Sequence, residues 1–208
     1  MVKDLFTIGH SSHELHDFLR LLQEYGVEAV CDVRSSPYSG RNPQFNKEAL
    51  RDALSERRIR YVFLGKELGA RSEDPGSYVD GQARYDRIAK TDLFKSGLER
   101  VLKGAQSFRV ALMCAEGDPL SCHRTILVCH ELKNSDLSIA HILSNGTIES
   151  HEDAEERLLR ITGLENGDLF RERSELIEEA YEAHGRKIAY RRPTEGAGGD
   201  QPPSEVLQ

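Results

Sequence analysis

One short stretch of the chain holds most of the side chains that could do chemistry. Between Cys114 and Arg124 the sequence reads Cys-Ala-Glu-Gly-Asp-Pro-Leu-Ser-Cys-His-Arg. A turn that only reverses the chain uses Gly, Pro, Asn or Asp, whereas this one also holds two thiols, an imidazole and a guanidinium. It follows the apolar run Arg109–Met113 and precedes Thr125–Leu132, so it should connect a buried strand to a helix. We therefore expect a functional site at this turn.

Cys122, His123 and Arg124 stand at the expected start of that helix. Free backbone amides and the helix dipole favour an anion there and lower the pKa of a thiol. Cys122 is therefore the candidate nucleophile, and His123 and Glu116 are candidates for acid–base catalysis. Arg124 could bind a carboxylate or phosphate through two hydrogen bonds. The competing interpretation is a packed cysteine and a structural ion pair.

Cys114 ends the expected strand, where a free cysteine is often only a small core residue. With Glu116 and Cys122 nearby, it is also a candidate for substrate binding. No metal is expected, because Cys114 and Cys122 lack the short ligand spacing of structural zinc sites. Cys122 and His123 should also point in different directions at a helix start. A site formed by His10, Cys114 and Cys122 in three dimensions is left open.

Three further polar clusters follow strand candidates in the same way. They are Gly9-His10-Ser11 after Leu5–Ile8, Asp32-Val33-Arg34 after Val27–Cys31, and Gly65-Lys66-Glu67 after Ile59–Phe63. The carboxyl ends of parallel strands meet at one edge of a sheet, and ligands bind beyond that edge. The clusters are therefore expected to share one site with the turn at 114–124.

His10 suits an acid–base role, and Asp32 is a catalytic candidate that could orient it. For both residues a structural hydrogen bond to the loop is the competing interpretation. Arg34 is expected to bind the anion, or to pair with Asp32 and shape the site. The expected substrate-binding set also includes other side chains of these loops: Ser11, Lys66 and Arg71.

Strand and helix patterns alternate along residues 1–150, which predicts an α/β core domain. We expect a mainly parallel sheet with helices on both faces and a terminal β-hairpin. The hairpin is predicted where Ser138–Leu143 and Thr147–Glu149 flank the turn signal Ser-Asn-Gly. Ser11 and Glu14 have the spacing of a capping box for the first helix. Further helices are predicted over Lys47–Arg57 and from Asp92, capped by Thr91, to about Lys103, and the segment 70–84 should be irregular.

The remainder of the chain has a different composition. Residues 151–190 are expected to form a helical extension packed on the core, with charged amphipathic helices over 151–164 and 168–187. Residues 191–208 are rich in Pro and Gly and nearly without apolar side chains. Such a composition predicts a disordered tail.

The composition favours a cytoplasmic protein. The 208 residues carry a formal net charge of −7, and the four cysteines lack the spacing of a disulfide framework. The N-terminus has no apolar signal region, and no run approaches the ~20 apolar residues of a membrane span. Residues 34–90 hold 12 Lys and Arg against 8 Asp and Glu, which could form an anion-binding face or only a solvated surface of mixed charge.

The order of the motifs resembles that of the family catalogued as domain of unknown function 488. The motifs are Thr7–Ser11, Asp32-Val-Arg34 with Ser36-Pro37, Leu64–Gly69, Cys114-Ala-Glu116 with Cys122-His-Arg124, and His141-Ile142. The resemblance covers residues 5–151 and implies an α/β domain whose motif positions share a site. It implies no mechanism. The helices after His151 and the tail look like additions to the common core.

A weaker resemblance is to rhodanese-type sulfurtransferases, which place a reactive cysteine at the head of a short loop that wraps an anion. It rests on Asp32-Val-Arg34 and on a cysteine-containing turn after a later strand. Here nine residues separate Cys114 from Arg124, and Glu116 and Asp118 put negative charge into the loop. The pattern therefore departs from an anion cradle and from the C-x5-R spacing of phosphatases.

These observations lead us to expect an enzyme of unknown reaction that acts on an anionic, nucleotide- or nucleic-acid-like substrate. We expect no cofactor and no membrane partner. One alternative is a non-enzymatic nucleotide- or nucleic-acid-binding module that uses the same residues. Another is a rhodanese-like sulfurtransferase, which a persulfide on Cys114 or Cys122 would indicate.

Overall fold

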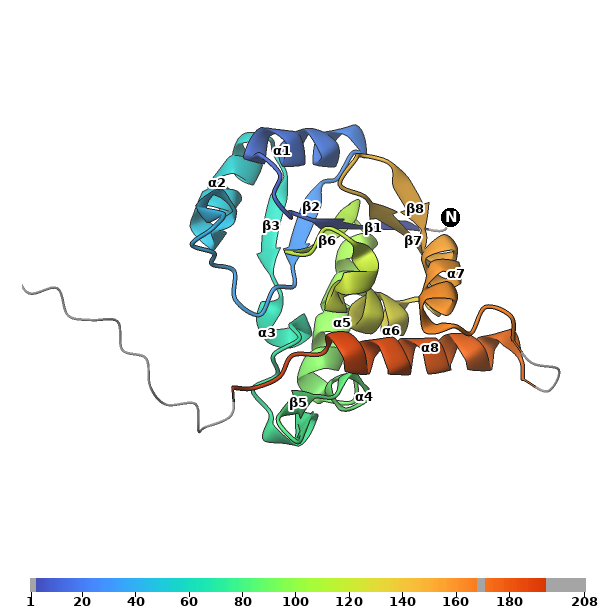
Figure 1. The fold of residues 1–208 in the computed structure, drawn as a ribbon. Coiled ribbons are helices and arrows are strands. Elements are labelled where there is room, and N and C mark those ends of the chain that lie inside the picture. The colour runs from blue at the N-terminus through green and yellow to red at the C-terminus, as the bar shows by residue number, and fades with distance from the viewer. Residues whose placement is uncertain (1–2, 168–170, 194–208) are drawn as a thin grey trace, which may run out of the picture.

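The computed structural model describes residues 3–167 and 171–193. A six-stranded sheet lies at its centre, in the order β3–β2–β6–β1–β7–β8 (Figure 1). The strands are β1 (Lys3–Gly9), β2 (Ala29–Asp32), β3 (Arg60–Phe63), β6 (Val110–Cys114), β7 (Leu137–Ile142) and β8 (Ile148–Ser150). All neighbouring pairs are parallel except β7 and β8, which form the hairpin. The predicted α/β fold, with a mainly parallel sheet and a terminal hairpin, is confirmed.

Helices pack against both faces of this sheet. On one face lie α1 (Leu15–Glu24) and α2 (Lys47–Glu56), and on the other lie α3 (Gly65–Leu68) and α5 (Asp92–Ala105). Thr91 caps α5, as predicted, by accepting a hydrogen bond from the amide of Phe94. The helices predicted over 47–57 and 92–103 are therefore present, with ends within two residues of those expected.

The central strand β6 is apolar at every position because helices cover both faces of the sheet. Val110, Leu112 and Cys114 pack with α3 and α5, whereas Ala111 and Met113 pack with α1 and α2. All five residues are at most 3% exposed. A strand covered on both faces must be apolar at successive positions and not only at alternate ones.

The helix that follows the turn at 114–124 begins differently from the prediction. Arg124–Cys129 forms a π-helix, and α6 (His130–Leu132) continues it. All six residues of the π-helix are buried. The backbone of Arg124 is thus part of a wide helical turn, which is a conformation often found at functional sites.

The chain ends in a helical extension. α7 (His151–Thr162) and α8 (Arg173–Ile188) pack together over a small apolar cluster that includes Leu120 and Ile126 (Figure 1). Residues 168–170, where the second helix was expected to begin, lie outside the described residues. The extension therefore covers the loop before the π-helix and part of the π-helix itself.

The capping box predicted for the first helix is wrong. α1 begins at Leu15 with Glu14 as its N-cap, and Ser11 lies before it with a φ of 46°. The amide of Ser11 donates to the carbonyl of Ala115, and its carbonyl accepts a hydrogen bond from Asn42. Ser11 therefore binds two other loops at the sheet edge and does not start the helix.

The segment 70–84 also contains regular structure. The strands β4 (Tyr78–Val79) and β5 (Gln82–Ala83) form a small hairpin, which precedes α4 (Tyr85–Ile88). Arg191 pairs with Gln82, and the amide of Arg192 donates to Gly81. The first residues of the expected tail are therefore held by this hairpin, and the rest of that prediction, from 194 on, lies outside the described residues.

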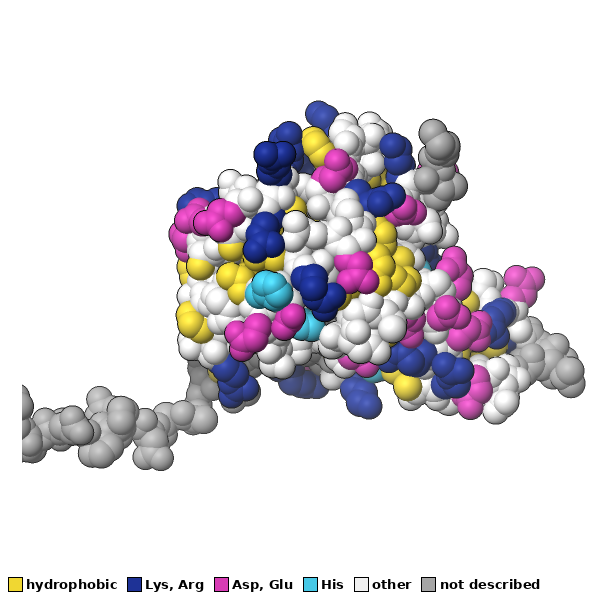
Figure 2. Space-filling model, turned by 90° about the horizontal axis from the view of Figure 1, so that it is seen from above, with side chains coloured by type: hydrophobic (Ala, Val, Ile, Leu, Met, Phe, Trp, Pro, Cys, Tyr) yellow, Lys and Arg dark blue, Asp and Glu magenta, His cyan; other side chains and the backbone are white. Residues whose placement is uncertain are grey.

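Charges of both signs are interspersed on the face of the molecule shown in Figure 2. Within the basic segment 34–90, arginines pair with nearby acids, as in Arg51–Asp52 and Arg84–Asp86. This arrangement favours a solvated surface of mixed charge over a basic face. None of the helices within 3–167 and 171–193 has the length and apolar composition needed to cross a membrane.

Candidate functional site

A cavity of about 400 Å³ lies beyond the carboxyl ends of β2 and β6. Its wall combines the loop after β2, the segment after α3, the loop after β6 and the residues at the end of α8. The volume is in the range of ~300–1,000 Å³ that is usual for small-molecule sites. A larger cavity of about 610 Å³ lies between α4 and α8, but no residue of the four motif clusters lines it. The smaller cavity is therefore the candidate site.

A compact group of reactive side chains meets this cavity. The thiol of Cys114 donates to Oε2 of Glu116 at 3.0 Å, and its Sγ lies 3.7 Å from Nδ1 of His123. The Sγ of Cys122 lies 3.8 Å from the same nitrogen. Cys114, Glu116 and His123 line the cavity, and Cys122 lies directly behind them. Both cysteines and the histidine are buried, whereas Glu116 is exposed. We call these four residues the reactive cluster.

The local backbone explains how two cysteines eight positions apart in sequence meet. Asp118 caps a short turn at Pro119–Ser121 by accepting from the amide of Leu120, and this turn brings the chain back toward β6. Cys122 then has an extended backbone, with φ −134° and ψ 141°. Because Cys122 precedes the helix, the expectation that it and His123 point in different directions is wrong.

The tautomer of His123 is fixed by its second nitrogen. Nε2 lies 3.0 Å from the carbonyl oxygen of Val33. A carbonyl can only accept, so Nε2 carries a proton and donates it. In the neutral imidazole the free lone pair is therefore on Nδ1, which faces both sulfur atoms.

The thiols differ sharply in acidity. Burial raises the pKa of Cys114 well above its ordinary value, and the adjacent Cys122 and Glu116 raise it further. Burial also opposes ionisation of Cys122, but the hydrogen bond from Cys114 and the charges of Arg124 and His123 lower its pKa well below the ordinary value. One thiolate on Cys122, beside a neutral thiol on Cys114, is the arrangement that these interactions favour.

The negative charge of Cys122 also shifts the pKa values of His123 and Glu116. Burial lowers the pKa of His123, but the thiolate of Cys122 outweighs it and the net shift is upward. Burial raises the pKa of Glu116, and the charge of Cys122 raises it further. A carboxyl group whose pKa is raised toward neutrality can both accept and release a proton.

Asp32 and Arg34 form a buried pair beside the cluster. Nε and Nη2 of Arg34 donate to the two oxygens of Asp32 at 2.9 and 2.6 Å, and Nη2 also donates to the carbonyl of Phe45. The hydroxyl of Tyr61 donates to Asp32 at 2.7 Å. Asp32 has no exposed surface and does not line the cavity, and of the two expected arrangements its contacts match the pair with Arg34 and not the orientation of His10. Arg34 lines the cavity, and among the described residues its Nη1 makes no hydrogen bond.

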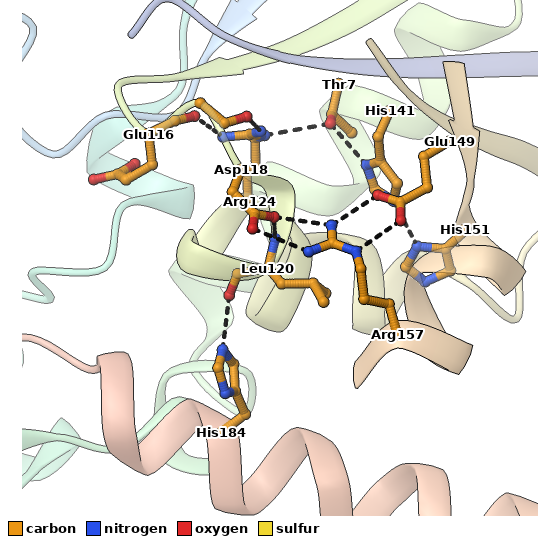
Figure 3. Close-up of polar contacts among 11 residues, drawn as sticks. Thr7, Glu116, Asp118, Leu120, Arg124, His141, Glu149, His151, Arg157 and His184 are labelled. Carbon is orange, nitrogen blue, oxygen red and sulfur yellow. Dashed lines mark hydrogen bonds and ion pairs between the residues drawn. The ribbon is translucent and has the colours of Figure 1, made fainter. Parts of the chain in front are cut away.

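Arg124, expected to bind substrate, instead bonds to groups of the protein itself. Its side chain is fully buried, and it does not line the cavity. Its guanidinium donates to the carbonyls of Glu116 and Gly117 at 2.6 and 3.1 Å, and to the hydroxyl of Thr7 at 3.3 Å (Figure 3). Arg124 thus holds the loop after β6 through hydrogen bonds, and these bonds occupy the guanidinium that was expected to bind an anion.

The extension holds the same loop from the other side (Figure 3). Arg157 in α7 binds Asp118, and Nε2 of His184 in α8 lies 2.9 Å from the carbonyl of Leu120. A buried chain of polar contacts continues from Thr7 through His141 and His151 to Tyr181. The loop that carries Glu116 and Cys122 is therefore bound by both the core and the extension.

Two glycines of the motif clusters allow the loops to approach the strands. A Cβ on Gly9 would lie 1.8 Å from the carbonyl oxygen of Glu116, and one on Gly65 would lie 1.9 Å from that of Arg34. No side chain fits at such distances. The backbone of each glycine therefore contacts the backbone of a site residue from a different loop.

His10 lies close to the cluster but outside the cavity wall. Its ring stacks on Phe45 with centroids 4.5 Å apart, and Nδ1 lies 3.1 Å from the carbonyl of Ser11. Burial, with a smaller effect of Arg34, lowers its pKa to about 4. His10 is therefore neutral near pH 7, and the structure places it as a packing residue of the loop.

The remaining expected residues divide between the cavity and the surface. Arg71 lines the cavity, and its guanidinium carbon lies 4.6 Å from the ring centroid of Tyr190. Ser11 and Lys66 do not line it. Ser36, which belongs to a motif expected to share the site, lines the cavity, but several other lining residues were missed, namely Ser35, Tyr38, Tyr85, Ser121, Ile188 and Tyr190. Tyr38 follows the Asp32–Arg34 motif closely and could have been found, but no local signal marks Tyr190.

Residues 14–130 match the family described as Domain of unknown function DUF488. No curated protein matches the chain. The matched segment includes the whole reactive cluster and Arg34, but it ends well before Ile188 and Tyr190. The cavity is therefore built from the family segment and from the helical extension together.

Proposed function

Because the chain belongs to the DUF488 family, whose description names no reaction, we propose a function from the site alone: an enzyme that acts on a small anionic, nucleotide-like substrate. One observation carries this proposal. The reactive cluster opens onto the same cavity as the guanidiniums of Arg34 and Arg71. An anion held by these arginines would lie next to Cys114, Glu116 and His123.

The arginines and the aromatic residues suit different parts of such a substrate. Arg34 is fixed by Asp32 and has Nη1 left to donate, so it can bind a phosphate or carboxylate oxygen without reorganising. Arg71 offers a second charge in the wall of the same cavity. Tyr85 and Tyr190 in the wall provide faces on which a planar base could stack.

The reactive cluster supplies groups for proton transfer and for nucleophilic attack. Glu116 is exposed to the cavity and has a raised pKa, which suits a general acid or base. Cys122 has the lowered pKa of an activated thiol, with His123 beside it. A module that only bound an anion would have no use for this combination at the end of the cavity.

The size of the cavity and the surface charge favour a mononucleotide over a polymer. The volume of about 400 Å³ accommodates a small molecule. A protein that binds nucleic acid through its backbone needs a continuous basic surface. On the face in Figure 2 both signs are mixed, and the whole chain carries a formal charge of −7.

A ligand panel tests the proposal. We expect nucleoside mono- and diphosphates to bind in isothermal titration, and product to accumulate on longer incubation, measured by mass spectrometry. Arg71→Ala should weaken binding about tenfold, roughly 1.4 kcal/mol, whereas Arg51→Ala on the exposed face of α2 should not. Glu116→Gln should retain binding and lose turnover.

Other outcomes would support the alternatives. A panel member that binds but stays unchanged in the presence of the wild-type protein would indicate a binding module. A persulfide on either cysteine after incubation with thiosulfate, without turnover of nucleotides, would indicate a sulfurtransferase. Binding that Arg71→Ala and Arg51→Ala weaken equally would contradict the placement of the ligand in this cavity.

A further inference from the structure

We propose that Cys114, Cys122 and His123 bind a zinc ion. Sγ of Cys114, Sγ of Cys122 and a ring nitrogen of His123 all lie within 4.8 Å of one another. They come from the end of β6 and from the extended segment before the π-helix, so two rigid elements present them. Thiolate and imidazole are the ligands that zinc takes most often in proteins.

The distances between the ligand atoms fit one ion. In a tetrahedral site, with Zn–S of about 2.3 Å and Zn–N of about 2.0–2.1 Å, a sulfur and a nitrogen lie about 3.6 Å apart. The two sulfur atoms lie 3.7 and 3.8 Å from Nδ1 of His123. Both sulfur–nitrogen distances are therefore within a few tenths of an ångström of those in a tetrahedral site, and the two sulfur atoms lie within 4.8 Å of each other.

The orientation of His123 is the one that metal-binding histidines have. A ligating imidazole usually donates its other ring N–H to a backbone carbonyl or carboxylate, which fixes the ring and its tautomer. Here Nε2 donates to the carbonyl of Val33, and Nδ1 faces the two sulfur atoms. The ring therefore needs no rotation to bind an ion.

Two thiolates would neutralise the charge of a zinc ion in this buried place. Without a metal, two buried thiolates a few ångströms apart repel each other, and each loses its hydration. With zinc, the ion, two thiolates and a neutral imidazole have no net charge. The soft sulfur ligands also exclude Mg²⁺ and Ca²⁺, which prefer oxygen.

The fourth ligand position would face the cavity. Oε2 of Glu116 lies 3.0 Å from Sγ of Cys114, and Glu116 reaches the cavity together with Cys114 and His123. Glu116 or a water molecule could occupy this position. Sites with three protein ligands and an open position are typical of catalytic zinc. A catalytic role of the ion, but not zinc binding itself, rests on the proposed function, since a zinc-bound water in the cavity could replace Cys122 as the nucleophile.

Cobalt substitution tests the site directly. The full chain is reduced, treated with a chelator, freed of it and titrated with Co²⁺. We expect one Co²⁺ per chain, with the visible bands of tetrahedral cobalt and a thiolate-to-cobalt charge-transfer band, and we expect Zn²⁺ to remove both. Absence of the charge-transfer band would overturn the inference, as would an intramolecular disulfide with no metal binding after reduction.

Variants assign the ligands. Cys114→Ser, Cys122→Ser and His123→Gln should each weaken Co²⁺ binding by at least the 10–100-fold that changes around a metal site cost. Cys31→Ala is the matched control, because Cys31 is also a buried free thiol but lies in β2 outside the group. Equal weakening by Cys31→Ala would contradict the assignment.

A measurement on the wild-type chain covers the case in which ligand variants fail to fold. X-ray absorption of the zinc-loaded protein should show two sulfur ligands at about 2.3 Å and at least one nitrogen or oxygen at about 2.0–2.1 Å. A shell of oxygen and nitrogen alone would overturn the inference. Turnover that persists in the chelated protein would contradict a catalytic role of the ion while leaving the proposed enzyme intact. Tight zinc binding without any turnover would contradict the proposed enzymatic function and support the zinc site.

Discussion

The guanidinium of Arg157 in α7 forms a paired hydrogen bond with the carboxylate of Asp118, at 3.0 and 2.9 Å (Figure 3). The same guanidinium binds both oxygens of Glu149 at 2.8 Å. Asp118 in turn caps the short turn that returns the chain to Cys122. An arginine in the helical extension thus fixes the loop that joins the two cysteines of the site.

We expect Arg157→Met to lower the free energy of unfolding by about 1 kcal/mol, since a paired but partly exposed ion pair contributes little more. It should also weaken Co²⁺ binding, because the loop before Cys122 is released on one side. Urea denaturation and the cobalt titration measure the two effects. Arg160→Met, an exposed position on the same helix, is the control, and an equal effect there would assign the loss to the helix itself.

Removing the guanidinium of Arg124 should be more costly. Arg124→Met leaves the partly buried carbonyls of Glu116 and Gly117 without their donor, and an unpaired group shielded from water costs about 1–3 kcal/mol. We therefore expect a loss of about 2–5 kcal/mol in urea denaturation. A variant of unchanged stability that had lost only ligand binding would restore the anion-binding role that the sequence suggested.

The stability of the protein should depend on His10 in mildly acidic solution. Its pKa is lowered to about 4 in the folded protein, against about 6.5 in the unfolded chain. Between these values the unfolded state binds the proton and the folded state does not, so the stability contributed at neutral pH is lost as the pH falls. We expect the free-energy difference between the wild type and His10→Gln to shrink by an amount on the order of 3 kcal/mol from pH 7 to pH 4. A constant difference across this range would contradict a buried neutral His10.

The four thiols should react at different rates in the reduced, metal-free protein. The pKa of Cys122 is lowered, whereas burial raises those of Cys31 and Cys129 to about 12. A small alkylating reagent should therefore modify Cys122 before Cys31 and Cys129, as followed by peptide mass spectrometry. Zinc should slow this reaction, and in urea all four thiols should react alike. If Cys114 is modified first instead, access from the cavity and not acidity decides the rate.

Much of the fold could be predicted from the sequence because its strands are short apolar runs between clear helical patterns. The convergence of the loops after β1, β2 and β6 also follows from parallel strands, since their carboxyl ends share an edge. The π-helix at Arg124–Cys129 could not be predicted, because its residues have the same apolar periodicity as an ordinary buried helix. The start of α1 was misplaced because Ser11 has the residue type of a cap but bonds to Ala115 across the sheet edge.

The roles of the charged residues were harder to predict than their location. Arg34 and Arg124 have the same residue type, and both follow a strand of the sheet. Arg34 lines the cavity, whereas the guanidinium of Arg124 donates hydrogen bonds to two backbone carbonyls. Only three-dimensional contacts distinguish them. The meeting of Cys122 and His123 likewise depends on the extended backbone at Cys122, which residue type does not reveal.

The cavity has one wall from the family segment and one wall from beyond it. Cys114, Glu116 and His123 belong to residues 14–130, whereas Ile188 ends α8 and Tyr190 follows it. One side of the cavity therefore depends on how the chain after residue 130 folds back onto the core. Substitutions at Ile188 and Tyr190 alone would reshape this side of the cavity while leaving Cys114, Glu116 and His123 in place.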